Sequence, residues 1–284
     1  MLKERLLKNL IYPIVKKILQ KSAKNYTIKE KYDQLVVYAY DSVSSDINLN
    51  GIYEKELLFF LRNFLKERNL DFSNHTALDI GAYIGNHSIF FSKLFSEIIS
   101  FEPHPTSFEI LKINCKKYKN IKLLNFGCSD VNTNSFLRLK HTNIGGSSIS
   151  DGKHDRDVAI KLIKLDDFFK DYSKKIGLVK IDAEGHESKV IDGSLNILKI
   201  NKPIILMELR NYQNDSEPDV IKKLKSIGYN KFFELENKIK FDKLQNNIFL
   251  SFIDKIINLA FENQVVMKEI KLYKKKEYQN IIII

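Results

Sequence analysis

Two acidic side chains stand at positions where they could bind a nucleoside. Asp79 lies in the apolar run 76–80, which is followed by two glycines in the pattern Gly81-x-x-x-Gly85. A second apolar run, 98–101, ends at Glu102, about 20 residues further along the chain. Glycine lets a ligand approach the backbone, and an acid at the tip of the next strand can accept hydrogen bonds from ribose hydroxyls. The spacing predicts a nucleoside cofactor held between the ends of two strands.

The glycine spacing narrows the choice of cofactor. A dinucleotide site needs Gly-x-Gly-x-x-Gly, so that a pyrophosphate can sit on a helix N-terminus, and a P-loop ends in Gly-Lys-Ser/Thr. The second and third dinucleotide glycines have no clear counterparts here, and the P-loop ending is absent. The loop therefore favours a ligand with ribose but without phosphate, such as S-adenosylmethionine. An NAD-dependent oxidoreductase is the less favoured alternative.

A third group of polar residues follows the apolar run 178–181. It comprises Lys180, Asp182, Glu184 and His186. Ligands of parallel sheets bind at the carboxyl ends of strands, so this group should face the same crevice. We expect Asp182 or His186 to act as the general base, Glu184 to orient the base or the substrate, and Lys180 to steady a carboxylate or an anionic substrate. A divalent metal between Asp182 and Glu208 is considered but not favoured.

Two further motifs could contact the base of a nucleoside. Asp130 follows the predicted strand 121–126 and could bind an exocyclic amine, with Ser129 beside the ring. His104 lies between Pro103 and Pro105, just after Glu102, and either lines the adenosine pocket or caps the next helix.

The composition indicates a globular α/β protein with a basic surface. The chain has 284 residues, 44% hydrophobic and 29% charged, and a net charge of +11. Its two cysteines suit a reducing compartment, and no apolar run reaches the length of a membrane span, so we expect a cytoplasmic protein. The dispersed lysines favour an anionic or nucleotide-linked substrate over nucleic acid.

The pattern of apolar residues divides the chain into three parts. Residues 1–30 form a basic segment whose amphipathic helix, 2–20, should kink or break at Pro13; it would bind a membrane surface, its own domain or a second copy of the chain. Residues 31–75 form an extension, a candidate substrate lid, with a strand at 33–40, a polar loop and a helix at 53–68. Residues 76–284 form a Rossmann-like domain. Its expected strands are 76–80, 98–102, 121–126, 134–139, 178–182, 203–208, 231–236, 247–252 and 265–273, and its expected helices are 86–95, 106–118, 187–199 and 217–227.

Taken together, the motifs resemble the FkbM family of S-adenosylmethionine-dependent methyltransferases. The resemblance runs from about Asp41 to Glu208. Its motifs are residues 51–54 (GIYE), 79–86 (DIGAYIGN), 101–105 (FEPHP), Leu111 with Asn114, 127–130 (GCSD), 145–148 (GGSS), 165–167 (LDD) and 180–187 (KIDAEGHE). Tyr83 replaces the more usual asparagine, and Cys128 a small aliphatic residue.

The resemblance implies a class I methyltransferase sheet, mostly parallel, with helices on both faces and late antiparallel strands. It also implies methylation of a sugar hydroxyl in a nucleotide-sugar or surface glycan, with S-adenosylhomocysteine as the product. A non-sugar acceptor is the alternative. The residues expected to bind the cofactor are Asp79, Gly81, Ala82, Tyr83, Gly85, Asn86, Glu102, Pro103, His104, Ser129 and Asp130.

Overall fold

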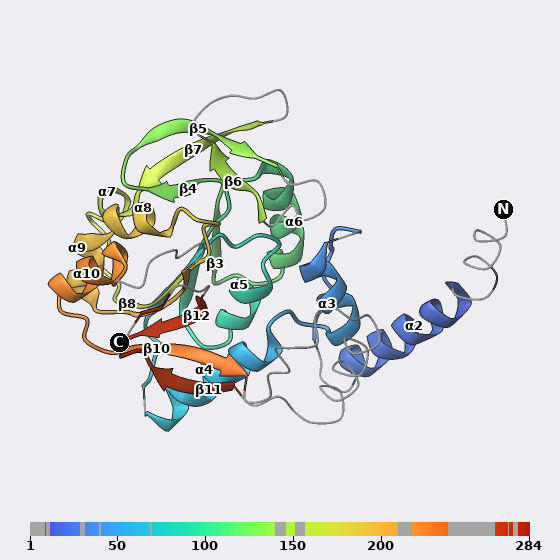
Figure 1. Cartoon of the computed structure of the whole chain (residues 1–284). Coiled ribbons are helices and arrows are strands. Elements are labelled where there is room, and N and C mark those ends of the chain that lie inside the picture. Colours follow the sequence, from blue (N-terminus) through green and yellow to red (C-terminus); the bar gives the residue numbers. More distant parts are fainter. Residues whose placement is uncertain are drawn as a thin grey trace.

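An eight-stranded sheet forms the centre of the molecule (Figure 1). The computed structural model describes residues 9, 12–28, 32–39, 41–68, 70–139, 146–150, 157–209, 217–237, 265–271, 273–274 and 278–284. The strand order is β11-β10-β12-β9-β8-β1-β2-β3. The strands are β1 (Thr76–Ile80), β2 (Glu97–Phe101), β3 (Ile121–Leu124), β8 (Ile176–Ile181), β9 (Ile204–Leu209), β10 (Phe232–Asn237), β11 (Val265–Glu269) and β12 (Tyr278–Ile283).

The order in which strands are added to the sheet reverses at β1. From β1 the chain adds β2 and then β3 on one side, and it later adds β8 and β9 on the other, with all five strands parallel. Strands β12, β10 and β11 then extend the sheet in antiparallel pairs. The predicted fold class is therefore confirmed. The gap between the ends of β1 and its neighbours is where ligands of such sheets bind.

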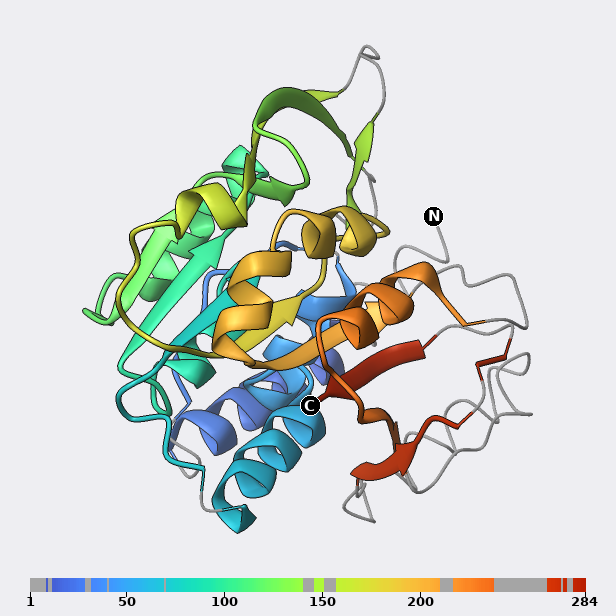
Figure 2. The ribbon, with the colours of Figure 1, turned by 90° about the vertical axis from the view of Figure 1, so that its left-hand side faces the viewer.

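Alternation of apolar residues along the buried strands gives the sheet two packed faces. Leu78, Ile99 and Val179 point to the face covered by α8 (Glu187–Asp192), α9 (Leu195–Asn201) and α10 (Asp219–Ser226). The residues before them, Ala77, Ile98 and Leu178, point to the face covered by α4 (Lys55–Glu67) and α5 (Asn86–Phe91). Figure 2 shows α8, α9 and α10 in gold and orange, and α4 in light blue. The period of two along each strand places successive side chains in different cores.

The segment between β3 and β8 folds into a separate four-stranded sheet. Its order is β4-β7-β5-β6, formed by β4 (Gly127–Ser129), β7 (Val158–Lys164), β5 (Thr133–Arg138) and β6 (Ser148–Ser150). The predicted hairpin strand 134–139 is β5. A short helix, α7 (Leu165–Phe168), follows β7, and α6 (Pro105–Cys115) links β2 to β3.

Several sequence predictions are corrected by the structure. Residues 32–39 form no strand; they run past α6, where the amide of Asn114 binds both the N–H and the carbonyl of Val36. The expected polar loop after Asp41 is a helix, α3 (Ser42–Asn50), because the Asp41 carboxylate caps it by accepting from Ser44 N at 2.6 Å. The predicted helix 187–199 is two helices, α8 and α9, separated at Gly193 and Ser194.

The N-terminal helix ends later than expected. Helix α2 covers Tyr12–Ile28, and Pro13 lies in its first turn, where the missing N–H of proline removes no helical hydrogen bond. Residues 2–8, 10 and 11 of the predicted helix 2–20, and the predicted strand 247–252, lie outside the described residues. Strand β12 was not predicted. Among the described helices, none combines the length and the apolar character needed to cross a bilayer.

Candidate active site

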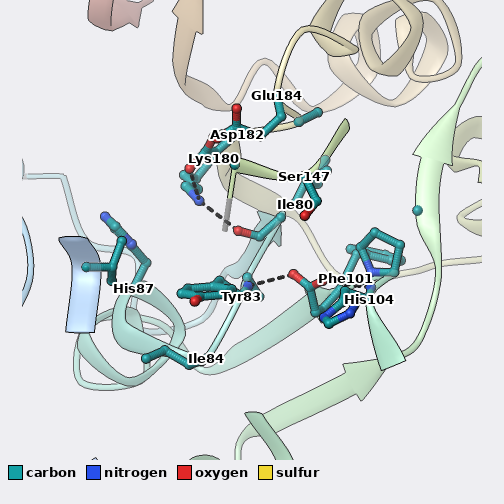
Figure 3. Close-up of a pocket in the computed structure, with 18 of the residues that line it drawn as sticks. Ile80, Tyr83, Ile84, His87, Phe101, His104, Ser147, Lys180, Asp182 and Glu184 are labelled. Atoms are coloured by element: carbon teal, nitrogen blue, oxygen red, sulfur yellow. Dashed lines mark hydrogen bonds and ion pairs between the residues drawn. The ribbon is translucent and has the colours of Figure 1, made fainter. Parts of the chain in front are cut away.

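One cavity opens at the carboxyl ends of β1, β2, β8 and β9 (Figure 3). The loops after these strands supply most of its wall, and the small sheet and the segment 42–54 close the rest. Of the residues predicted to bind cofactor or catalyse, those lining it are Gly81, Ala82, Tyr83, Asn86, Glu102, Pro103, His104, Lys180, Asp182 and Glu184. The structure therefore brings the three predicted acidic motifs to a single crevice.

Glu102 is fixed in this cavity by two backbone donors. Its Oε2 accepts from Tyr83 N and its Oε1 from His104 N, both at 2.8 Å. The carboxylate is only 6% exposed. Burial raises the pKa of Glu102 to about 7, although the two N–H groups and the Lys180 charge oppose the shift. Each oxygen keeps acceptor capacity that the protein does not use, because a carboxylate has about four lone-pair sites.

The two motif glycines are needed for packing within the protein. Gly81 has φ of +77°, and a Cβ there would lie 1.9 Å from the carbonyl oxygen of Asp182. Gly85 has φ of +95°, and its Cβ would meet Leu111 and Cys115 of α6 at 2.7 and 3.0 Å. The close approach at Gly81 joins the loops after β1 and β8. Gly85 does not line the cavity.

Lys180 lies between the carboxylates of two neighbouring strands. Its Nζ donates to the Gly81 carbonyl at 3.0 Å and forms ion pairs with Asp182 at 3.4 Å and Asp79 at 3.5 Å. Burial alone would lower the pKa of Lys180, but the carboxylates of Asp182, Asp79 and Glu54 raise it above its ordinary value. Asp79 is fully buried and also accepts from Ser88 Oγ at 2.5 Å. Lys180 thus steadies carboxylates, one of its two expected roles.

Asp182 offers one carboxylate oxygen at this end of the cavity. Its side chain is 33% exposed, and its Oδ2 lies 3.4 Å from Lys180 Nζ. Its Oδ1 is buried and has no hydrogen-bond partner among the residues that the structure describes, so Oδ2 is the oxygen that a bound molecule can reach. A carboxylate oxygen has more than one lone pair, so Oδ2 can accept a proton or a hydrogen bond beside its ion pair.

Tyr83 forms the floor between the two ends of the cavity. In Figure 3 its ring lies between His104 on one side and His87 on the other, below Lys180 and Asp182. The ring stacks on Tyr38, with centroids 5.6 Å apart, and its hydroxyl donates to Asp41. Burial and the Asp41 carboxylate raise the pKa of the Tyr83 hydroxyl, which remains protonated. This hydrogen bond joins Asp41, just before α3, to the loop between β1 and α5 that contains Tyr83.

Asn86 brings the N-terminal extension into the site. Its side-chain amide exchanges two hydrogen bonds of 3.0 Å with the backbone of Tyr53. In the residues that follow each of these two, His87 Nε2 lies 3.0 Å from Glu54 Oε2. Burial alone would raise the pKa of Glu54, but the bond from His87 and the charge of Lys180 lower it. Glu54 is thus a carboxylate that orients the His87 ring.

Sequence reasoning did not assign His87, Glu54 or Tyr53 to the site, although all three line the cavity. His87 and Glu54 lie 33 positions apart, so no local spacing pairs them. Two signals were available: His87 follows Asn86 directly, at the start of the helix after the glycine loop, and Tyr53 and Glu54 belong to the motif 51–54. Glu208, which the sequence suggested only as a metal ligand, also lines the cavity.

Three predicted residues form a separate cluster. His186 Nε2 lies 2.9 Å from Ser129 Oγ, and Asp130 forms an ion pair of 2.7 Å with Lys189. None of these side chains lines the cavity. The chain enters the small sheet at β4, which pairs with β7 and directs Ser129 toward α8. His104, in contrast, lines the cavity and also caps α6 by accepting from Ser107 N at 3.2 Å.

The loop after β8 is shaped by a buried acid. Glu187 Oε1 accepts from Gly185 N at 3.0 Å and Ala183 N at 3.2 Å. Burial raises its pKa above the ordinary value. Glu184 adopts φ of 51° in this loop and lines the cavity. Within the described part of the chain, no group of three or more His, Cys, Asp or Glu side chains could hold a metal ion.

Comparison with known proteins places this site within a family. Residues 79–231, more than half of the chain, match the family model described as "Methyltransferase FkbM domain". No curated protein sequence matches the chain significantly.

Similar solved structures include methyltransferase FkbM from Methylobacillus flagellatus, with 17% identity and a TM-score of 0.44, covering 59% of this chain. The chain spans only 41% of that protein. The precorrin-6y C5,15-methyltransferase of Geobacter metallireducens has 13% identity and a TM-score of 0.41, covering 82% of this chain and 93% of its own. A putative methyltransferase of Streptococcus mutans in complex with SAH has 13% identity and a TM-score of 0.40, covering 82% and 99%. The family match carries the assignment: the chain belongs to the FkbM methyltransferase family.

Proposed function

We propose that this chain binds S-adenosylmethionine in the cavity and methylates a hydroxyl group of a sugar, in a nucleotide-sugar or a surface glycan. The observation that carries the proposal is Glu102, whose two oxygens are held by Tyr83 N and His104 N at 2.8 Å beside the glycine loop. A carboxylate fixed in this way at the tip of β2 can accept both hydroxyls of a ribose.

The donor and acceptor groups of the cavity fit this cofactor. Glu102 would hold the ribose, and Tyr83 with the loop around Gly81 would border the amino-acid part. Four more acidic residues, Glu54, Asp182, Glu184 and Glu208, line the cavity, and Lys180 is the one lysine among its described lining residues. This lining suits a positively charged sulfonium and opposes a pyrophosphate. The fit therefore favours S-adenosylmethionine over a dinucleotide.

When bound, S-adenosylmethionine supplies an electrophilic methyl group and leaves as S-adenosylhomocysteine. The residues of the chain position the acceptor and remove its proton. Asp182, whose side chain lines the cavity and is 33% exposed, takes the proton from the acceptor hydroxyl through Oδ2. Lys180 Nζ, 3.4 Å from that oxygen, holds the carboxylate in place. Positioning contributes roughly 7–11 kcal/mol and a base about 10²–10⁴-fold, so orientation outweighs proton removal.

Polar side chains at the mouth of the cavity support a sugar acceptor. Ser42, Ser147, Tyr53 and His87 join the carboxylates in lining it. Hydroxyls, an imidazole and carboxylates together can donate to and accept from the many hydroxyls of a sugar. Because the carboxylates crowd the reaction end, any phosphate of a nucleotide-sugar would lie outside it, nearer the basic surface.

Two measurements test the proposal. Calorimetry with S-adenosylmethionine, S-adenosylhomocysteine and NAD should show binding of the first two alone. Incubation with methyl-labelled cofactor and a panel of nucleotide-sugars, glycans and hydroxylated non-sugar compounds should label a saccharide. Binding of NAD alone would refute the cofactor, and labelling confined to the non-sugar compounds would refute the acceptor.

A further inference from the structure

Helix α2 exposes a continuous apolar face. Tyr12, Val15 and Leu19 follow each other at helical spacing, and Ile14 and Ile18 widen the stripe. Their exposed fractions range from 36% for Leu19 to 63% for Tyr12. Single exposed apolar residues are common on protein surfaces, but five within about two turns form a continuous face whose exposure to water costs free energy.

The opposite side of α2 is basic. Lys17, Lys21 and Lys24 follow the same helical spacing, Lys16 borders the stripe, and all four are exposed. The helix contains no aspartate or glutamate. Four positive charges beside an apolar stripe on one short helix are the pattern of a helix that lies in a membrane interface, with its lysines reaching toward anionic headgroups.

The packing of α2 leaves this face available. Its second half contacts α3, where the Ser22 hydroxyl donates to the Leu49 carbonyl and Ala23 and Thr27 are partly buried. Its first half projects away from the central sheet (Figure 1). The contact at Ser22 lies on the continuation of the stripe, so it fixes the direction of the helix and leaves the stripe from Tyr12 to Leu19 exposed beyond it.

We infer that the apolar face of α2 lies on an anionic lipid bilayer. Charge selects this partner over a second copy of the chain, because a second copy also carries a net charge of +11 and its α2 has no acidic residue to pair with these lysines. Anionic headgroups instead attract each lysine with about 1 kcal/mol, or about fivefold in affinity. The helix holds the catalytic domain at the membrane surface without spanning it.

Vesicle flotation of the full chain tests this inference. The wild type should float with vesicles of phosphatidylcholine and phosphatidylglycerol, and should stay in solution with phosphatidylcholine alone. The double variant Ile18→Gln/Leu19→Gln should lose flotation, because glutamine keeps helix propensity but removes the apolar contact. Lys17→Gln should weaken binding about fivefold.

The matched control is Ile200→Gln on α9, which changes a side chain that is 80% exposed far from α2 in the sequence and should float as the wild type does. Three results would overturn the inference. The wild type could fail to float with anionic vesicles, or the Ile18/Leu19 variant could float unchanged. Alternatively, that variant could lose a concentration-dependent dimer in sedimentation or a large part of its unfolding free energy, which would show that protein covers the face.

Discussion

Replacement of Gly81 by alanine should destabilise the fold more than the same replacement at Gly185. Both glycines have positive φ, +77° and +95°, so alanine costs about 1–2 kcal/mol at either site. At Gly81 the new Cβ would also lie 1.9 Å from the Asp182 carbonyl oxygen, whereas at Gly185 no atom lies within 4 Å. The backbone shift that Gly81→Ala forces should cost about 1–3 kcal/mol more.

Urea unfolding measures the difference directly. Gly185→Ala should lower the free energy of unfolding by about 1–2 kcal/mol, and Gly81→Ala by about 2–5 kcal/mol, both read from the midpoint at constant slope. Because the φ penalty is common to both variants, their difference reports the contact between the two loops alone. Equal losses in the two variants would refute the close approach of Gly81 to the loop after β8.

Five further variants probe the site. Because burial raises the pKa of Glu102 to about 7, its folded form holds a proton that the unfolded chain releases; its contribution to the unfolding free energy should fall between about pH 4.5 and about pH 7. Glu102→Gln should remove this slope in pH-dependent unfolding, and Glu102→Ala should weaken S-adenosylmethionine binding at least about tenfold in calorimetry. Asp182→Asn should reduce turnover of the acceptor found in the panel about 10²–10⁴-fold with little change in cofactor affinity; a larger loss in His87→Ala than in Asp182→Asn would make His87 the base. Lys180→Met leaves Asp79 buried without its cation, and should cost about 3–5 kcal/mol in urea unfolding; a loss below 1 kcal/mol would show that the pair is not buried in solution.

The central sheet was predictable because its signals are local. Strands β1, β2, β8 and β9 are nearly continuous apolar runs, as expected for strands buried on both faces. Each run ends in the polar residues that line the cavity, so the meeting of Gly81, Glu102 and Asp182 followed from the rule for parallel sheets alone.

The rest of the site depends on contacts between distant parts of the chain. Nothing in the sequence joins Glu54 to His87, or the amide of Asn114 to Val36, because each pair is matched only after the core has formed. The same holds for His186, whose position beside the cavity motif suggested catalysis while its side chain turns to Ser129. The glycine motif predicted that a ligand approaches the backbone, whereas in the structure the atoms close to Gly81 belong to the Asp182 backbone.

The position of β12 has a consequence for how the protein is made. Residues 278–283 form an interior strand, between β9 and β10, and Ile281, Ile282 and Ile283 are fully buried there. During synthesis every other strand of the sheet leaves the ribosome first. The edge of β9 stays unpaired until translation reaches these isoleucines, and an open β-edge invites pairing with other chains. The sheet is therefore completed by a late insertion of β12 between β9 and β10, and chaperone protection would matter most before that step.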